Sequence, residues 1–389
     1  MIAKRVEVLS ESLTIAITTL AKDMRDNGED VLSFSAGEPD FGTPEVIRNA
    51  AIAAIREGNS SYTAIPGTLE VLQAVKTKLK RDNGLDYEVS DIVTSNGAKH
   101  SLFNLFQVLL NKGDEVIIPA PYWVTYPEIV KYSEGIPVFI DTDDVSEFKI
   151  SPKQLKNAIT DKTKVLILNA PSNPTGLIYS RKELEALAEV LIGTDVLVFS
   201  DEMYEKIIFD DTEFVSMASI NEDMFKRTIT INGLSKSVAM TGWRFGYFAT
   251  PIKEITIAVN KLQSQSTSNI NSITQKSAIP ALLGEADDDI EMMRKEFEKR
   301  RNLAVKMFSK IDGLSAVKPN GAFYIYVNFE DITNNSVEFC KRLLEEKHVA
   351  TVPGLGFGLE GHMRFSFATD EKTIIAGIKR IEDFVKSYK

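Results

Sequence analysis

Short apolar runs alternate with longer amphipathic segments through the middle of the chain. The amphipathic segments with a helical period include Ala98–Leu110 and Arg181–Leu191. The apolar runs are Asp91–Thr94, Glu115–Ile118, Lys164–Leu168, Val196–Phe199 and Thr228–Ile231. Apolar strands that alternate with helices are typical of a mostly parallel sheet with helices on both faces. We therefore predict an α/β fold, with ligands bound beyond the carboxyl ends of the strands.

The pattern changes near residue 286. A highly charged helix is predicted at Asp287–Phe308, and alternating strands follow at Ala322–Val327 and Met363–Ala368. A chain of 389 residues is long enough for two cores. We expect an amphipathic N-terminal segment, residues 1–45, that packs with a small α+β domain at 287–389, and a large domain at 46–286.

Composition and charge narrow the classes of function. The net charge is −10, from 45 Lys and Arg against 55 Asp and Glu, which argues against nucleic-acid binding. The single cysteine, Cys340, lies in a predicted helix and is expected to be a buried thiol in a reducing compartment. His100, His348 and His362 lack metal-ligand spacing, so no metal site is predicted. No apolar run approaches the roughly 20 residues that cross a bilayer, and we expect a cytoplasmic protein without membrane contact.

Two polar residues follow a buried strand near residue 200. The segment from 195 to 204 reads Asp-Val-Leu-Val-Phe-Ser-Asp-Glu-Met-Tyr, which places Asp201 at the strand end and Tyr204 just beyond it. A buried carboxylate is costly without a partner, so Asp201 is expected to face a cation or a protonated ring nitrogen. The alternative is an aspartate that caps a following helix.

A lysine stands about four residues after the next strand. Lys236 lies in the small-residue loop Asn-Gly-Leu-Ser-Lys. A lysine that loses water near other cations has a lowered pKa, and its neutral amine can attack an aldehyde. A solvated surface lysine is the alternative reading.

Several groups suit an anion or a polar ring. Arg244 is flanked by glycines in Thr-Gly-Trp-Arg-Phe-Gly and suits a phosphate, although an ordinary ion pair is the alternative. Gly97 and Ala98 begin a predicted helix whose amides point toward an anion, as at many helix starts. Asn173 is held before a proline in the turn 169–176, where it is free to donate an amide hydrogen bond or is part of a plain turn.

Taken together, these residues resemble the class I aminotransferases of fold type I, and most closely the bacterial gamma subgroup of aspartate and prephenate aminotransferases. The resemblance runs nearly end to end. Its landmarks are Ser-Ala-Gly-Glu-Pro-Asp-Phe at 35–41, Tyr62-Thr63, Gly97-Ala98-Lys99, Pro121-Tyr122-Trp123, Asn173-Pro174-Thr175-Gly176, Asp201-Glu202-Met203-Tyr204, Ser235-Lys236, Gly242-Trp243-Arg244 and Arg364 before Phe365-Ser366.

The resemblance implies pyridoxal 5'-phosphate as the cofactor. It makes Lys236 the Schiff-base lysine and Asp201 the partner of the pyridine nitrogen. It also implies that Asn173 and Tyr204 hold the ring oxygen and that Trp123 stacks on the ring. The phosphate would be bound by a further set, Gly97, Ala98, Arg244 and, from the neighbouring subunit of a homodimer, Tyr62.

The resemblance also implies a substrate class. Arg364 would grip the α-carboxylate, helped by Asn173 and the backbone of Gly37. The stretch 263–269 has no arginine for a side-chain carboxylate. The gamma subgroup instead uses a lysine and a Ser-x-Thr pair, which here are Lys99, Ser12 and Thr14.

We therefore expect transfer of the amino group of L-aspartate or L-glutamate to 2-oxoglutarate or oxaloacetate, with prephenate as a possible second substrate. The alternatives are an aminotransferase for aromatic or other neutral amino acids and a lyase of the same fold. For Lys99 and Ser12 the alternative is a structural role, in which Lys99 is a solvated lysine at a helix start and Ser12 caps a helix. The chain departs from the family at Gly233, where a serine is common, and at Phe245, where an aliphatic residue is expected.

Overall fold

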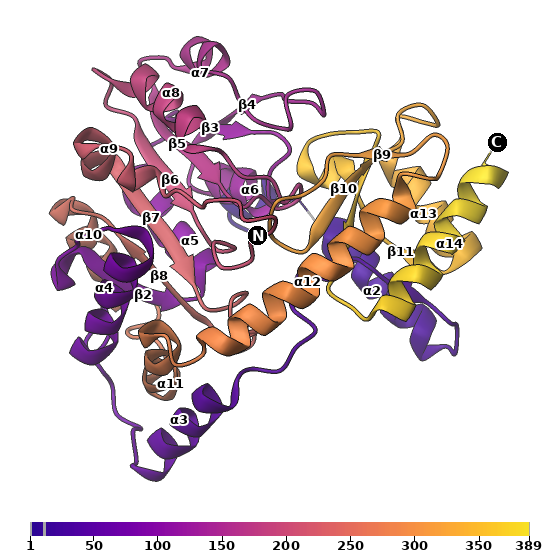
Figure 1. Ribbon diagram of the computed structural model, residues 1–389. Coiled ribbons are helices and arrows are strands. Elements are labelled where there is room, and N and C mark those ends of the chain that lie inside the picture. The colour runs from indigo at the N-terminus through magenta and orange to yellow at the C-terminus, as the bar shows by residue number, and fades with distance from the viewer. Residues whose placement is uncertain (1, 11–12, 389) are drawn as a thin grey trace.

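The computed structural model describes residues 2–10 and 13–388, without the side chains of residues 13–15. Figure 1 shows two lobes joined by the long helix α12 (Asp287–Phe308). A large sheet with its helices forms one lobe, and a smaller sheet with the last helices forms the other. The described residues contain no helix that is both long and apolar enough to cross a bilayer.

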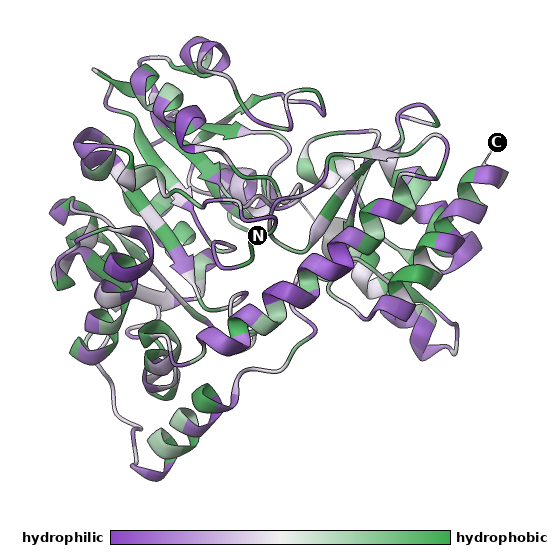
Figure 2. Ribbon diagram, viewed as in Figure 1, coloured by the Kyte–Doolittle hydropathy of each residue, from purple (hydrophilic) through white to green (hydrophobic). Residues whose placement is uncertain are grey.

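The large sheet is seven-stranded and mostly parallel, with the order β2-β8-β7-β6-β5-β3-β4. Its strands are short, and every residue of β7 and β8 is buried. Figure 2 shows hydrophobic residues along the strands at the centre of this lobe. The strands are β2 (Ile92–Asn96), β3 (Glu115–Pro119), β4 (Ile136–Ile140), β5 (Thr163–Asn169), β6 (Leu197–Asp201), β7 (Thr228–Gly233) and β8 (Phe245–Ala249).

Strand β8 is antiparallel to both of its neighbours, β2 and β7. The sequence pattern did not predict this strand. Parallel neighbours need a crossover of a dozen or more residues, usually a helix. Only the loop 234–244 joins β7 to β8. The chain therefore turns back at this edge, and one loop carries both Lys236 and Arg244.

Helices cover both faces of the large sheet, as predicted. The helices α5, α6 and α10 pack on one face, where Phe106, Ile129 and Val259 belong to one apolar cluster with β2, β6 and β8. On the other face, clusters around Leu79 and Leu187 join the sheet to the remaining helices. The helices of this lobe are α3 (Glu45–Arg56), α4 (Leu69–Asn83), α5 (Ala98–Leu109), α6 (Thr125–Tyr132), α7 (Pro152–Ala158), α8 (Arg181–Leu191), α9 (Glu222–Arg227), α10 (Lys253–Ser264) and α11 (Ser272–Leu283).

The small lobe contains a four-stranded antiparallel sheet with the order β12-β13-β10-β9. Its strands are β9 (Ser315–Ala316), β10 (Tyr324–Asn328), β12 (Val352–Pro353) and β13 (His362–Ser366). Helix α14 (Glu371–Ser387) packs against α12, and α13 (Ser336–Lys347) packs against α14. Cys340 is fully buried in α13, and burial raises the pKa of its thiol to about 12, as expected of a structural cysteine.

The N-terminal segment divides between the lobes. Helix α1 (Lys4–Glu7) lies against α6 of the large lobe, while α2 (Leu13–Asp26) packs on β11 (Val349–Ala350) and β12 of the small lobe. Strand β1 (Leu32–Ser33) then pairs in parallel with β11. The domain boundaries at 45/46 and 286/287 stay predictions.

Candidate active site

The carboxyl ends of three neighbouring parallel strands gather the polar residues that the sequence singled out. Asn169 at the end of β5 pairs with Asp201 at the end of β6, and Asp201 pairs with Ile231 of β7. Lys236 follows three residues after β7 ends at Gly233. The alternation of strands and helices therefore brings residues far apart in sequence to one edge of the sheet.

A pocket of about 370 Å³ lies at this edge, between the two lobes. Residues of both lobes line it, including Tyr324 and Arg364 from the small lobe. The predicted residues that line it are Gly37, Ala98, Lys99, Trp123, Asn173, Asp201, Tyr204, Lys236, Arg244 and Arg364.

Asp201 is a buried carboxylate that faces the pocket. It accepts a hydrogen bond from Tyr126 Oη at 2.7 Å, and its other oxygen accepts one from the Met203 amide at 3.3 Å. Burial raises the pKa of Asp201, although the bond from Tyr126 acts in the opposite direction. No helix begins directly after this residue, so it is not a helix cap. A positive group in the pocket would stabilise its ionised form.

Lys236 is a half-buried amine that points into the same pocket. Its Nζ donates to the carbonyl oxygen of Gly37. The pKa of Lys236 is lowered to about 8, mainly by burial and also by the nearby cations Arg364, Arg244 and Lys99, while the charge of Glu38 acts in the opposite direction. The alternative of a solvated surface lysine is therefore wrong, and a substantial fraction of neutral amine is present near neutral pH.

The start of α5 and Arg244 form an anion-binding corner. Helix α5 begins at Ala98, so the first amides of this helix lack intrahelical partners. Gly97 has a φ of +80°, and a Cβ there would lie 2.2 Å from Nη2 of Arg244. Arg244 donates to the backbone oxygens of Thr241 and Asn96, and no described carboxylate pairs with it. The guanidinium is held beside the helix start without neutralisation, so the ion-pair alternative does not apply.

Arg364 is a buried cation without a described anionic partner. It donates through Nη1 to Asn173 Oδ1 at 3.0 Å and through Nη2 to the Ser35 oxygen at 2.8 Å. Its Nε is buried and makes no hydrogen bond within the described chain. The guanidinium lies over the ring of Tyr324, 4.4 Å from the centroid. Burial lowers the pKa of Arg364. A carboxylate ligand would supply the missing counter-charge.

Aromatic rings form much of the remaining wall. Trp123 stands edge-on to Tyr126 with centroids 5.5 Å apart, and the ammonium of Lys99 lies 4.9 Å from the centroid of Trp123. The pKa of Lys99 is lowered, first by loss of water around the ammonium and then by Arg244. Tyr204 exchanges a hydrogen bond of 2.9 Å with the hydroxyl of Tyr324.

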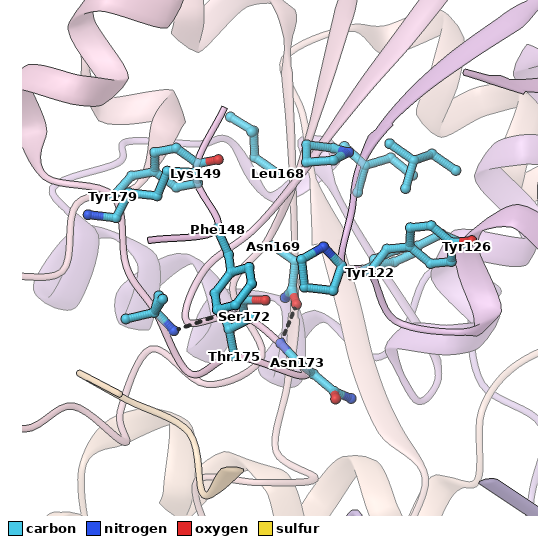
Figure 3. Close-up of a pocket in the computed structure, with 15 residues that line it drawn as sticks. Tyr122, Tyr126, Phe148, Lys149, Leu168, Asn169, Ser172, Asn173, Thr175 and Tyr179 are labelled. Carbon is cyan, nitrogen blue, oxygen red and sulfur yellow. Dashed lines mark hydrogen bonds between the residues drawn. The ribbon is translucent and has the colours of Figure 1, made fainter. Parts of the chain in front are cut away.

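Sequence analysis missed Tyr126 and Tyr324. Tyr126 is three residues after Trp123 at the start of α6, and Tyr324 begins β10. Both contact predicted residues only through the tertiary fold, and neither lies in a pattern that marks it as polar or functional. Tyr126 also belongs to a smaller cavity of about 30 Å³ behind the pocket, shared with Asn169 and Asn173 (Figure 3).

Some predicted residues lie outside this arrangement. Tyr62 is 88% exposed and does not line the pocket of its own chain. Ser12 lies outside the described residues, and only the backbone of Thr14, in α2, is described. Within the described ranges, no three His, Cys, Asp or Glu side chains gather as a metal site requires.

The two departures have structural reasons. Gly233 ends β7 against β8, and a Cβ there would lie 2.7 Å from the backbone oxygen of Phe245. A serine therefore does not fit this backbone. The ring of Phe245 is fully buried in the cluster that joins the large sheet to α4 and α11. Neither residue lines the pocket.

Comparison with known proteins supports the resemblance found in the sequence. The family model described as aminotransferase class I and II matches residues 29–381. An aspartate aminotransferase of Bacillus subtilis is 46% identical, with 100% of this chain and 99% of that protein covered. An aspartate/prephenate aminotransferase of Nitrosomonas europaea is 44% identical, with 98% of each chain covered.

Solved structures agree with the fold. A crystal structure of an aspartate aminotransferase from Rhizobium meliloti has a TM-score of 0.97 at 40% identity and covers 100% of both chains. The aspartate aminotransferase of Thermus thermophilus with maleate has a TM-score of 0.94 at 37% identity, with 98% of this chain and 99% of that chain covered. The predicted fold and family are confirmed.

Proposed function

Because this chain belongs to the class I and II aminotransferases, a pyridoxal-phosphate-dependent family, we propose that it moves the α-amino group of L-aspartate or L-glutamate to 2-oxoglutarate or oxaloacetate. The reaction would proceed in two halves, with the first keto acid released before the second one binds. The observation that carries this proposal is the buried Arg364, which has no described counter-ion and shares one pocket with Lys236 and Asp201.

The residues of the pocket fit the cofactor. Lys236 would be its covalent attachment point, and Asp201 would neutralise its protonated ring nitrogen. Tyr204 and Asn173 would bind its ring oxygen, and Trp123 would cover its ring. The cradle at Gly97, Ala98 and Arg244 would take its phosphate. When bound, the cofactor supplies an electron sink for the bond that breaks at the substrate Cα.

Arg364 would bind and orient the substrate through its α-carboxylate. Its two Nη atoms now donate to Asn173 and to the Ser35 backbone, and the substrate would join this network. A planar guanidinium that makes two parallel hydrogen bonds fixes direction as well as distance. The substrate Cα is thereby held toward the large-lobe side of the pocket, where Lys236 lies.

Lys236 would move the proton. Its lowered pKa of about 8 lets the amine accept a proton at one atom and return it at another near neutral pH. Tyr126 keeps Asp201 in place through the bond of 2.7 Å. The walls of Trp123 and Tyr324 limit the access of water to the reacting atoms.

Lys99 supports a dicarboxylic substrate. It lines the pocket beside Trp123, and no described carboxylate lies within ion-pair distance of it. Its ammonium would bind the distal carboxylate, with Ser12 and Thr14 as the remaining contacts. The similar Thermus thermophilus enzyme was crystallised with maleate, which is a dicarboxylate.

The test of substrate class is incubation with aspartate and 2-oxoglutarate. Oxaloacetate plus glutamate is the expected result, whereas release of ammonia would indicate a lyase. Preference for aromatic or other neutral amino acids would contradict a dicarboxylic substrate. Prephenate belongs in the same assay as an amino acceptor, because relatives such as the Nitrosomonas europaea protein are named aspartate/prephenate aminotransferases.

The variant Lys99→Ala tests the distal contact. A charge-assisted hydrogen bond contributes about 1.5–3 kcal/mol, so kcat/KM for aspartate should fall roughly tenfold or more while a monocarboxylic substrate such as alanine is spared. Lys112→Ala, at an exposed lysine three residues past the end of α5, is the control. Equal losses with both substrates would contradict the role of Lys99.

The proposal includes a homodimer. The exposed Tyr62 would reach the phosphate of the neighbouring subunit's cofactor, so each pocket would be complete only in the dimer. Exposed apolar residues on α3 and at the start of α4, among them Ile52, Ile55 and Leu69, fit a surface that another copy covers. We place the enzyme in the cytoplasm.

A further inference from the structure

A hydrogen bond between two buried tyrosines joins the lobes inside the pocket. Tyr204 follows β6 in the large lobe, and Tyr324 begins β10 in the small lobe. Their hydroxyl oxygens lie 2.9 Å apart, and their rings meet edge to face with centroids 5.8 Å apart. Both side chains line the pocket. Within the described residues, neither hydroxyl makes a hydrogen bond to another group of the chain.

The direction of this bond follows from the number of protons. Burial raises the pKa of both tyrosines above the usual value, so each hydroxyl keeps its one proton at neutral pH. A phenol hydroxyl donates once and can accept as well. An ionised ring oxygen of the cofactor only accepts, so the proton of Tyr204 would go to that oxygen. Tyr324 is then the donor in the bond between the two tyrosines.

The small lobe holds the ring of Tyr324 in place. The side chain is fully buried, and the residue pairs with Ser366 of β13 in the antiparallel sheet. The guanidinium of Arg364 lies over the ring, 4.4 Å from its centroid. A fixed ring therefore presents the hydroxyl to Tyr204. A phenylalanine at this position would keep the ring and its contact with Arg364, and it would lose only the hydroxyl.

We propose that Tyr324 is a positioning residue for the cofactor, because its hydroxyl donates to Tyr204 and thereby orients and strengthens the bond from Tyr204 to the ring oxygen. This role rests on the proposed function, which supplies the cofactor and the task of Tyr204. Hydrogen bonds in a chain polarise one another, so a hydroxyl that accepts one bond is a better donor in the next. The small lobe would in this way act on the cofactor as well as on the substrate.

The effect is measurable in the protonation of the nitrogen that Lys236 would share with the cofactor. In pyridoxal, the aldehyde and the hydroxyl stand on neighbouring ring carbons, so a proton on that nitrogen also neutralises the ring oxygen. A donor to the ring oxygen therefore stabilises the unprotonated form more than the protonated form. Tyr204 should lower the pH at which the nitrogen takes up its proton, and Tyr324 should lower that pH further through Tyr204.

The experiment titrates the absorbance of the loaded protein from pH 5 to pH 10 without substrate. The bound cofactor absorbs at different wavelengths with and without the proton on the shared nitrogen, so the midpoint pH needs no turnover. The variants are Tyr324→Phe, Tyr204→Phe and the double variant. Tyr326→Phe is the matched control, because Tyr326 is a buried tyrosine of the same strand that lies outside the pocket. Its hydroxyl donates to the backbone oxygens of Gly354 and Leu359.

The variants leave the charges of the pocket unchanged. Tyrosine with a raised pKa and phenylalanine are both uncharged over this pH range, so a moved midpoint reports hydrogen bonding. The charged side chains that act on the two phenols or on Lys236 are the same in every variant, and they are Arg364, Asp201, Glu38, Arg244 and Lys99.

The midpoints should follow a definite order. Tyr204→Phe removes a hydrogen bond to a charged oxygen and should raise the midpoint by about 1–2 pH units. Tyr324→Phe removes only the support of that bond and should raise it by about 0.2–0.6 pH units. Because Tyr324 acts through Tyr204, adding Tyr324→Phe to Tyr204→Phe should move the midpoint by less than about 0.1 pH unit. Tyr326→Phe should match the wild type equally closely.

Three results would overturn the role of Tyr324. The first is a midpoint of Tyr324→Phe within about 0.1 pH unit of the wild type. The second is a shift from Tyr324→Phe that is as large in the Tyr204→Phe background as in the wild type. The third is an equal shift in Tyr326→Phe. A wild-type protein that binds no pyridoxal 5'-phosphate, or that transfers no amino group, would overturn the proposed function instead, so the two failures are distinguishable.

Discussion

The pocket buries ionisable groups that make no ion pair within the described chain. The pKa of Asp201 is raised, and those of Lys236 and Arg364 are lowered, each with burial as the largest cause. All three shifts disfavour the charged form, so the burial of these three groups is electrostatically unfavourable unless a group of opposite charge joins them. Groups perturbed in this way mark functional sites more often than structural ones. A cofactor and a carboxylate substrate would offset the free-energy cost of burying these charges, because they would supply charges of opposite sign.

The first prediction at this scale concerns the apoprotein of Lys236→Met. The folded pKa of about 8 lies below the ordinary lysine value of 10.5, so the unfolded chain binds more protons between those values and wild-type stability rises with pH. The variant lacks this dependence. In denaturant unfolding, the free energy of unfolding of the variant should exceed that of the wild type most below pH 8, and the difference should shrink toward pH 10.5. A difference in the free energy of unfolding that grows with pH would contradict the lowered pKa of Lys236.

A second prediction concerns Arg364→Lys. A lysine keeps the charge but loses the planar pair of donors. With about 1.5–3 kcal/mol at stake for a charged hydrogen bond, KM for aspartate should rise roughly 10- to 100-fold in steady-state kinetics. The exposed helical pair of Arg342 with Glu346 provides the control Arg342→Lys, which should leave KM unchanged. A KM within twofold of the wild type would argue against substrate binding by Arg364.

At the residue scale, the sequence identifies the reactive residues of the pocket better than the residues that hold them in place. Lys236, Asp201 and Arg244 follow strands or stand among glycines, and this context is visible in the chain. Tyr126 matters because it donates a hydrogen bond to Asp201, and Tyr324 matters because its hydroxyl shares a hydrogen bond with that of Tyr204. Such contacts join positions up to 120 residues apart, which no local pattern encodes.

At the scale of elements, the hydrophobic pattern locates long helices and buried strands well. It places α8 and α12 at their observed bounds, because α8 follows the capping residue Ser180, α12 begins with three aspartates, and both keep a helical period throughout. It misses β8, because Phe-Gly-Tyr-Phe-Ala contains a glycine and follows a loop rather than a helix. That strand determines how the loop carrying Lys236 and Arg244 turns.

The close contact of β7 with β8 leads to a third prediction. In Gly233→Ser the new Cβ would meet the Phe245 oxygen at 2.7 Å, so one strand must shift. Overpacking of this kind typically costs about 1–3 kcal/mol, and chemical denaturation should show a loss in that range. Gly42→Ser is the control, because a Cβ at Gly42 would meet no atom within 4 Å and its φ lies outside the left-handed region. A Gly233→Ser protein as stable as the wild type would show that β8 can move.

At the scale of the whole molecule, the site exists only because the two lobes face each other. The small lobe supplies Tyr324 and Arg364, and the large lobe supplies Asp201 and Lys236. The change of pattern near residue 286 predicts a second domain, but it does not say which of its strands faces the first. The resemblance to a family assigned Arg364 to the pocket, whereas the strand pattern alone did not.

Mixed dimers test the proposed sharing of Tyr62. Lys236→Ala and Tyr62→Ala should each be impaired alone. After co-refolding, a hybrid dimer would combine an intact Lys236 from one chain with an intact Tyr62 from the other in one of its pockets. With random pairing, about a quarter of the pockets should regain wild-type turnover. Activity equal to the average of the two parents would show that Tyr62 does not cross between subunits.

The most direct test of the central claim is borohydride reduction of the loaded protein followed by peptide mapping. The account predicts that the cofactor's mass is fixed to Lys236 and to no other residue, and that Lys236→Ala both lacks the label and loses at least about 10²–10⁴-fold in turnover. Label on another lysine such as Lys99, or near-normal turnover without Lys236, would contradict it.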